Sequence, residues 1–136
     1  MSDTTQLTPE KIAQYRIELA DNENALIALD FIEEWEGDLA DAAESIATRN
    51  GIEGVEDKAN FRWFAIVLNK CRDSICQPEN RIVGEKIVPA IIPTLAEMIA
   101  ASFLCPSGIA TLLSTPVAIY IQEDGMDKFC QTSSDS

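Results

Sequence analysis

The chain contains no histidine, and this excludes several kinds of chemistry at once. A Ser-His-Asp or Cys-His pair needs an imidazole to take the proton of the nucleophile, and many metal sites need an imidazole nitrogen as a ligand. Catalysis would have to rest on carboxylates or thiols alone, and the sequence shows no such constellation beside a base. We therefore expect a protein that is not an enzyme and holds no cofactor or metal. A histidine-free enzyme or a metal-binding protein is one alternative.

Four cysteines are the remaining candidates for nucleophilic or metal chemistry: Cys71, Cys76, Cys105 and Cys130. A four-thiolate zinc site is one interpretation. Cys71 and Cys76, however, stand five positions apart, which is about 140° around a helix, whereas structural zinc sites use closer pairs on turns. The other interpretation is packing as small apolar side chains. Because no signal peptide is recognisable, we expect all four thiols to be reduced, metal-free and used for packing.

Carboxylates are abundant and unevenly distributed. Residues 21–57 hold twelve acidic side chains against the single Arg49, and they supply most of the net charge of -13. Paired acids serve catalysis only if one is held neutral and the other ionised, and this run lacks the glycine and the alternating spacing of a calcium loop. We interpret it as a solvated face. Its candidate partner-binding residues are Glu33, Glu34, Asp38, Asp41 and Glu44.

Glu97 is the only charged residue between Ile87 and Gln122. A lone carboxylate in an apolar run is either a buried acid with a raised pKa, as functional acids are, or part of a narrow exposed stripe. Thr94 and Ala101 share its helical side, which favours the exposed stripe. The possible buried acid remains the alternative.

The charge distribution argues against nucleic acid and anionic membrane as partners, because an acidic surface repels phosphate. The small-residue rhythm of residues 39–52 is similar to a helix-turn-helix, but the next helix offers only Lys58, Arg62 and Lys70 as cations. No Gly-rich phosphate loop is present. We therefore expect a protein partner with a basic surface.

Caps and apolar spacing place these residues on helices. Thr8, Asn22 and Asp38 are positioned to cap three helices that end near residues 20, 37 and 50. A fourth helix, from near Asp57 to before Pro78, is apolar on two faces and is expected to be central.

The later part of the chain is punctuated by prolines. A fifth helix is predicted from near Pro93 to near Cys105, and a short helix over residues 109–113 follows. The segment 117–121 has strand composition but no second strand to pair with, so we predict helix there as well. The second helix is expected to bury Trp35 with its other apolar residues.

Together these elements predict an all-α fold. The expected architecture is a single-domain bundle of about six to seven helices, with a central apolar helix and an apolar C-terminal helical hairpin. The domain spans residues 1–136, with 132–136 as a flexible tail. A chain of this length buries enough surface to fold without disulfide bonds.

Four short strings resemble small, all-helical cyanobacterial proteins to which no activity is assigned. The strings are Glu36-Gly37-Asp38-Leu39, Cys71-Arg72 with Ile75-Cys76, Thr115-Pro116-Val117-Ala118, and Lys128-Phe129-Cys130. The resemblance implies one domain over nearly the whole chain and assigns no catalytic or binding residue.

Three functional hypotheses follow from the sequence. The first is a small acidic cytoplasmic interaction or regulatory module that docks on a basic partner surface. The second is a membrane-associated or pore-type protein that uses the apolar hairpin 87–121, although Pro106, Gly108 and Pro116 break this run and favour a buried core. The third is the histidine-free enzyme or metal-binding protein. The first fits every feature of the sequence.

Overall fold

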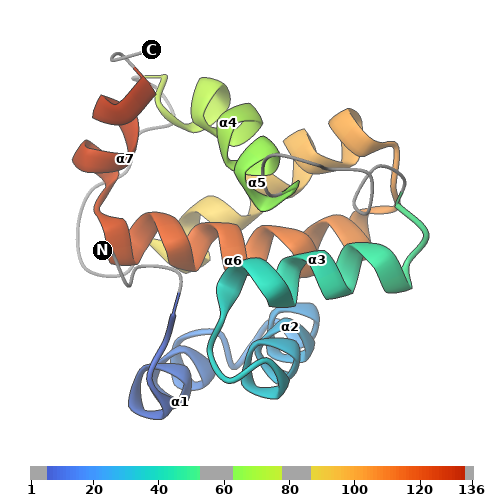
Figure 1. The fold of residues 1–136 in the computed structure, drawn as a ribbon, viewed down its shortest axis with the longest axis vertical. Helices are drawn as coiled ribbons and strands as arrows, with labels where there is room; N and C mark the ends of the chain where they lie inside the picture. The colour runs from blue at the N-terminus through green and yellow to red at the C-terminus, as the bar shows by residue number, and fades with distance from the viewer. Residues whose placement is uncertain (1–5, 53–62, 78–86, 134–136) are drawn as a thin grey trace.

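The computed structural model describes residues 6–52, 63–77 and 87–133, and within these ranges the chain forms seven helices (Figure 1). The helices are α1 (Pro9–Glu18), α2 (Glu23–Glu34), α3 (Leu39–Arg49), α4 (Trp63–Ile75), α5 (Val88–Phe103), α6 (Ser107–Asp124) and α7 (Met126–Ser133). The described residues contain no strand, only one isolated bridge between Gln6 and Asp38. The expected all-α, single-domain bundle is confirmed.

The first three helices begin where their capping residues predict. Each cap side chain accepts a hydrogen bond from an amide of the first turn, which satisfies a donor that has no partner inside the helix. The three bonds run from Lys11 N to Thr8 Oγ1 (3.2 Å), from Ala25 N to Asn22 Oδ1 (3.0 Å) and from Asp41 N to Asp38 Oδ1 (2.8 Å).

The turn between α2 and α3 depends on a glycine. Gly37 has a φ of 90°, and a Cβ there would collide with the carbonyl oxygen of Leu7. The Leu7 amide in turn donates to the Gly37 carbonyl at 2.8 Å. This close approach ties the segment before α1 to the start of α3, and it requires a residue without a side chain.

The central helix is α6 rather than α4. α6 packs against α2, α3, α5 and α7, and Figure 1 shows it lengthwise across the middle of the molecule with α3 alongside. α4 packs mainly against α3, α5 and α7, and it also meets α6 through the rings of Phe64 and Tyr120, 5.8 Å apart between centroids. The expectation that the fourth helix is central is therefore wrong. A helix with two apolar faces can also lie at the side of a bundle, where its neighbouring helices cover both faces. The predicted start of that helix near Asp57 lies outside the described residues.

Pro93 and Pro116 lie inside continuous helices, at positions where the sequence predicts a helix boundary. α6 is continuous through Pro116 and includes residues 117–121, so the predicted helix is confirmed there and the separate short helix is wrong. In this turn the hydroxyls of Ser114 and Thr115 both donate to the carbonyl of Thr111 at 2.9 Å. These two hydroxyls are thereby satisfied inside the helix, although both side chains are fully buried.

The fifth helix starts five residues earlier than predicted, at Val88, and continues through Pro93. Pro89 occupies its first turn, where an amide is not needed, and both prolines are exposed, so the carbonyl left without a donor lies on the solvent side. The amides of Ile87 and Val88 donate to Gln122 Oε1 of α6 at 3.2 and 3.3 Å. A side chain 34 residues away thus caps α5.

α5 and α6 form the C-terminal hairpin, which supplies much of the core. Ile99 of α5 and Leu113 of α6 are buried, whereas Leu112 is only half-buried and Leu104 at the bend is exposed. The expected flexible tail 132–136 overlaps α7, which ends at Ser133, and residues 134–136 lie outside the described residues.

Candidate functional site

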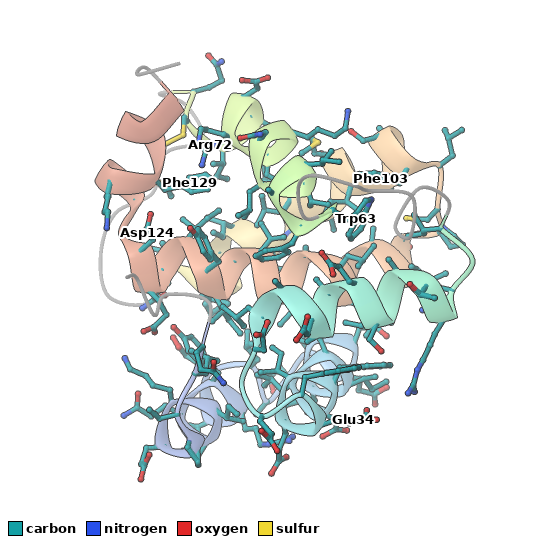
Figure 2. The ribbon with its side chains drawn as sticks, viewed as in Figure 1. Glu34, Trp63, Arg72, Phe103, Asp124 and Phe129 are labelled. Atoms are coloured by element: carbon teal, nitrogen blue, oxygen red, sulfur yellow. A yellow bond between two sulfur atoms is a disulfide. The ribbon has the colours of Figure 1, made fainter. Side chains whose placement is uncertain are left out.

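Six exposed carboxylates gather on α2 and the turns on either side of it, and we call this set the acidic surface: Asp21, Glu23, Asp30, Glu33, Glu34 and Glu36. Residues 6–52 hold eleven acidic residues against three basic ones, a net charge of -8 for this half of the bundle. Figure 2 labels Glu34 at the outer edge of α2, away from the core. An anion-rich surface of this kind attracts cationic partners.

All three basic residues of this half are already engaged in ion pairs with carboxylates. Arg16 bridges Asp30 at 2.9 Å and Glu33 at 2.6 Å, and both contacts join α1 to α2. The remaining pairs are Lys11 with Glu123 at 3.4 Å and Arg49 with Glu34 at 3.5 Å. Because no further cation stands in this half of the described chain, these pairs leave the net negative charge of the surface in place.

The five candidate partner-binding residues are not all on this surface. Glu33 and Glu34 are exposed, while Asp38, Asp41 and Glu44 are half-buried. Asp38 caps α3. Glu44 accepts a hydrogen bond from the amide of Phe64 at 3.1 Å, at the start of α4. Three of the five predicted residues are therefore half-buried, and two of them, Asp38 and Glu44, form hydrogen bonds at helix starts inside the bundle.

Exposed apolar side chains lie beside the acidic surface, and the sequence did not single them out. Ile27 on α2 is 45% exposed, Ile17 on α1 is 80% exposed, and Trp35 just after α2 is 42% exposed. The expectation that Trp35 is buried with the apolar stripe of its helix is wrong, because it follows the last helical residue and no longer points into the bundle. The signal for Ile27 was available, since it falls opposite the buried stripe on a helical wheel.

Glu97 lies exposed on α5. It occupies the stripe expected from Thr94 and Ala101, which are half-buried and exposed respectively. Glu97 is therefore not a buried acid.

An open groove of about 550 Å³ lies between α1 and the ends of α5 and α6. Its lining comprises Lys11, Gln14, Tyr15, Ile17, Glu18, Pro89 and Gln122. At its edge the hydroxyl of Tyr15 donates to Glu123 Oε2 at 2.7 Å, and burial, followed by this hydrogen bond, raises the pKa of Tyr15. The polar groups of the groove thus hold α1 to α6, and they form no nucleophile with an adjacent base.

The cysteines differ from the sequence-based expectation. Cys76 and Cys130 form a disulfide with a Cα–Cα distance of 5.6 Å, so the prediction of four reduced thiols is wrong. The two residues are 54 positions apart, a relation that spacing along one helix cannot show. Cys71 is a buried free thiol whose pKa burial raises to about 12, and Cys105 is half-buried. With two sulfurs bonded to each other, this form offers no four-thiolate zinc site.

In residues 6–52, 63–77 and 87–133, no group of three or more Cys, Asp or Glu side chains is arranged to hold a metal ion. Over the same ranges, no single helix is long and apolar enough to cross a bilayer. α5 and α6 pass that test by length and composition only when taken together, and they are bent by 118° at the break between them.

Comparison of the chain with protein-family models, curated proteins and solved structures gives no match. The resemblance to small cyanobacterial proteins therefore stays an expectation. The site must be interpreted from its own residues.

Proposed function

We propose that this protein is an interaction module whose acidic surface, on α2 and its flanking turns, docks on a basic surface of a partner protein. The observation that carries the proposal is the presence of an exposed apolar side chain within the carboxylates. Ile27, Asp30 and Glu34 stand at positions i, i+3 and i+7 of α2, so they share one side of the helix. An apolar contact surrounded by charge is the usual anatomy of a protein interface.

Charge and apolar area have different roles in such a contact. The carboxylates accelerate association with a cationic surface and set its orientation. Ile27 and Trp35 would supply apolar area that is dry only in the complex, and Trp is enriched among the residues that dominate binding energy. The half-buried Asp38 and Glu44, which cap α3 and α4, are not needed for this role.

A synthetic amphipathic peptide helix, with lysine on one side and leucine on the other, is a direct probe of the proposal. We expect it to bind the intact chain, to bind more weakly as salt rises because exposed charges are screened within about 10 Å, and to shift the emission of Trp35. Fluorescence anisotropy of a labelled peptide measures the affinity.

The decisive comparison uses two double variants with the same change in net charge. Glu33→Lys with Glu34→Lys reverses the acidic surface, and Asp73→Lys with Glu97→Lys reverses two exposed acids on α4 and α5. We expect the first to weaken peptide binding at least tenfold and the second to weaken it far less. Equal losses in the two variants would show attraction by net charge alone and contradict a specific docking surface. Trp35→Ala tests the apolar contact in the same assay.

A further inference from the structure

The C-terminal helix α7 is attached to the bundle in an unusual way. It has eight residues, and an isolated helix of this length is unstable in water. Gly125 separates it from α6, with a φ of 95° and with open space around the position where a Cβ would stand. Glycine at such a position allows the following helix to change direction about one residue. α7 therefore depends on tertiary contacts for its place and its order.

Those contacts converge on Phe129. Its ring is fully buried, with the guanidinium carbon of Arg72 4.4 Å from the ring centroid and the ring of Tyr120 at 6.3 Å between centroids. Arg72 Nε also donates to the carbonyl oxygen of Phe129 at 2.9 Å. Figure 2 shows Arg72 and Phe129 facing each other between α4 and α7, close to the yellow disulfide bond. Phe129 thus fills a site lined by the ring of Tyr120 and the guanidinium of Arg72.

A disulfide between Cys76 and Cys130 also crosses this contact, and its two cysteines differ in exposure. Cys76 follows the last residue of α4 and is half-buried, whereas Cys130 in α7 is 8% exposed. Thiol–disulfide exchange begins with attack of a thiolate on an accessible sulfur. Cys76 is therefore the sulfur that an external thiolate reaches first, and Cys130 is the leaving group.

We propose that the Cys76–Cys130 disulfide is a redox latch that holds α7 over the site filled by Phe129, and that its reduction by a cellular thiol releases α7 about Gly125. In the first step a thiolate RS⁻ bonds to the sulfur of Cys76, the S–S bond breaks, and Cys130 leaves as a thiolate that takes a proton. A second RSH then releases Cys76 as a thiol and forms RSSR. The disulfide gains two electrons and two thiols lose them, and RSSR reverses the reaction.

Release of α7 uncovers Arg72 and Tyr120. A cation beside an aromatic ring suits an apolar anion, and such a site would be distinctive in a protein with a net charge of -13. Anilinonaphthalene sulfonate, an aromatic anion, is therefore a suitable probe of the open form.

Hydrogen–deuterium exchange of the full chain, before and after treatment with dithiothreitol, tests the latch. Mass spectrometry after alkylation under denaturing conditions verifies each state, with two labelled cysteines in the oxidised chain and four in the reduced chain. On reduction we expect the amides of α7 to exchange roughly tenfold faster or more, since a short free helix opens readily, while those of α2, α3 and α6 keep their protection. Fluorescence of the sulfonate probe should rise at the same time.

Two variants separate the latch from other effects of reductant. Cys76→Ser with Cys130→Ser should behave as the reduced parent in both solutions, and Cys105→Ser should respond to reductant as the parent does. Unchanged protection of α7 in the verified reduced chain would overturn the proposal. Faster exchange of all helices together would overturn it equally, because the bond would then stabilise the whole bundle rather than hold one helix.

Discussion

Ile99 and Leu104 provide a matched pair for asking whether the apolar hairpin is a core or a membrane element. Both lie at the C-terminal end of α5, and truncation of either to alanine removes three carbon atoms. Ile99 is fully buried, whereas Leu104 is 89% exposed at the bend between α5 and α6. The two substitutions therefore have nearly the same chemistry and opposite burial.

The expected difference follows from burial and from the cavity left behind. Loss of the buried side chain of Ile99 forfeits its transfer free energy and leaves a void, so Ile99→Ala should lower the free energy of unfolding by about 3 kcal/mol. Leu104→Ala should change it by less than about 0.5 kcal/mol. The left-handed backbone of Leu104 does not alter this expectation, because alanine keeps the same Cβ.

Urea unfolding followed by circular dichroism measures both values in buffer without detergent. With an m value of about 2 kcal/mol per molar, the midpoint of Ile99→Ala should fall by about 1.5 M, and that of Leu104→Ala should stay in place. Equal effects of the two substitutions, or a parent chain that needs detergent to stay monodisperse, would refute burial of this hairpin. The membrane-associated alternative would then take first place.

Three further measurements follow from individual contacts. Native alkylation at neutral pH should label Cys105 and spare Cys71, because Cys71 is buried and its pKa is raised to about 12; early labelling of Cys71 in mass spectra would contradict this. The pKa of Tyr15 is raised by burial and by its bond to Glu123, so its neutral form stabilises the fold below pH about 10 and this contribution is lost as pH rises further; Tyr15→Phe should show a smaller alkaline loss of stability. Glu44→Ala should lower the free energy of unfolding by about 1 kcal/mol through loss of the cap on α4, and an unchanged urea midpoint would show that this cap contributes nothing.

Local signals predicted the first half of the fold well. The caps at Thr8, Asn22 and Asp38 involve residues three positions apart, so the sequence contains everything that determines them. The caps of the later helices are tertiary. Glu44 caps α4, and Gln122 caps α5 from 34 residues away. No local sequence pattern predicts either contact.

Proline ends helices less often in this chain than its local preference predicts, since α5 and α6 continue through Pro93 and Pro116. A single lost backbone bond costs less than the burial that a continuous helix gains, and α6 buries residues on both sides of Pro116. The same reasoning explains Pro93 on the exposed side of α5. Where burial is large, tertiary packing overrides the local preference.

The sequence predicts the negative charge of the candidate site, but not which of its residues are exposed. Composition alone located the acidic half, and Glu33 and Glu34 are exposed there. It could not separate surface acids from capping acids such as Glu44, because Glu44 lies in the middle of α3 and caps α4 only through tertiary packing. The exposure of Trp35 depends on where α2 ends, and element boundaries are the least certain feature of a sequence-based prediction.

The acidic surface and the helix α7 lie in differently packed parts of the molecule. α2, which carries most of the acidic surface, packs against the central helix α6, so this surface stands on a well-packed part of the bundle, as a docking surface requires. Among the described helices α7 packs mainly against α4 and α6, and it is joined to α6 through Gly125. In Figure 1 it lies on the side of α6 opposite to α1 and α2. Opening of α7 should therefore leave peptide binding by the acidic surface unchanged, and a reduced chain that lost this binding would show that the two ends are coupled through α6.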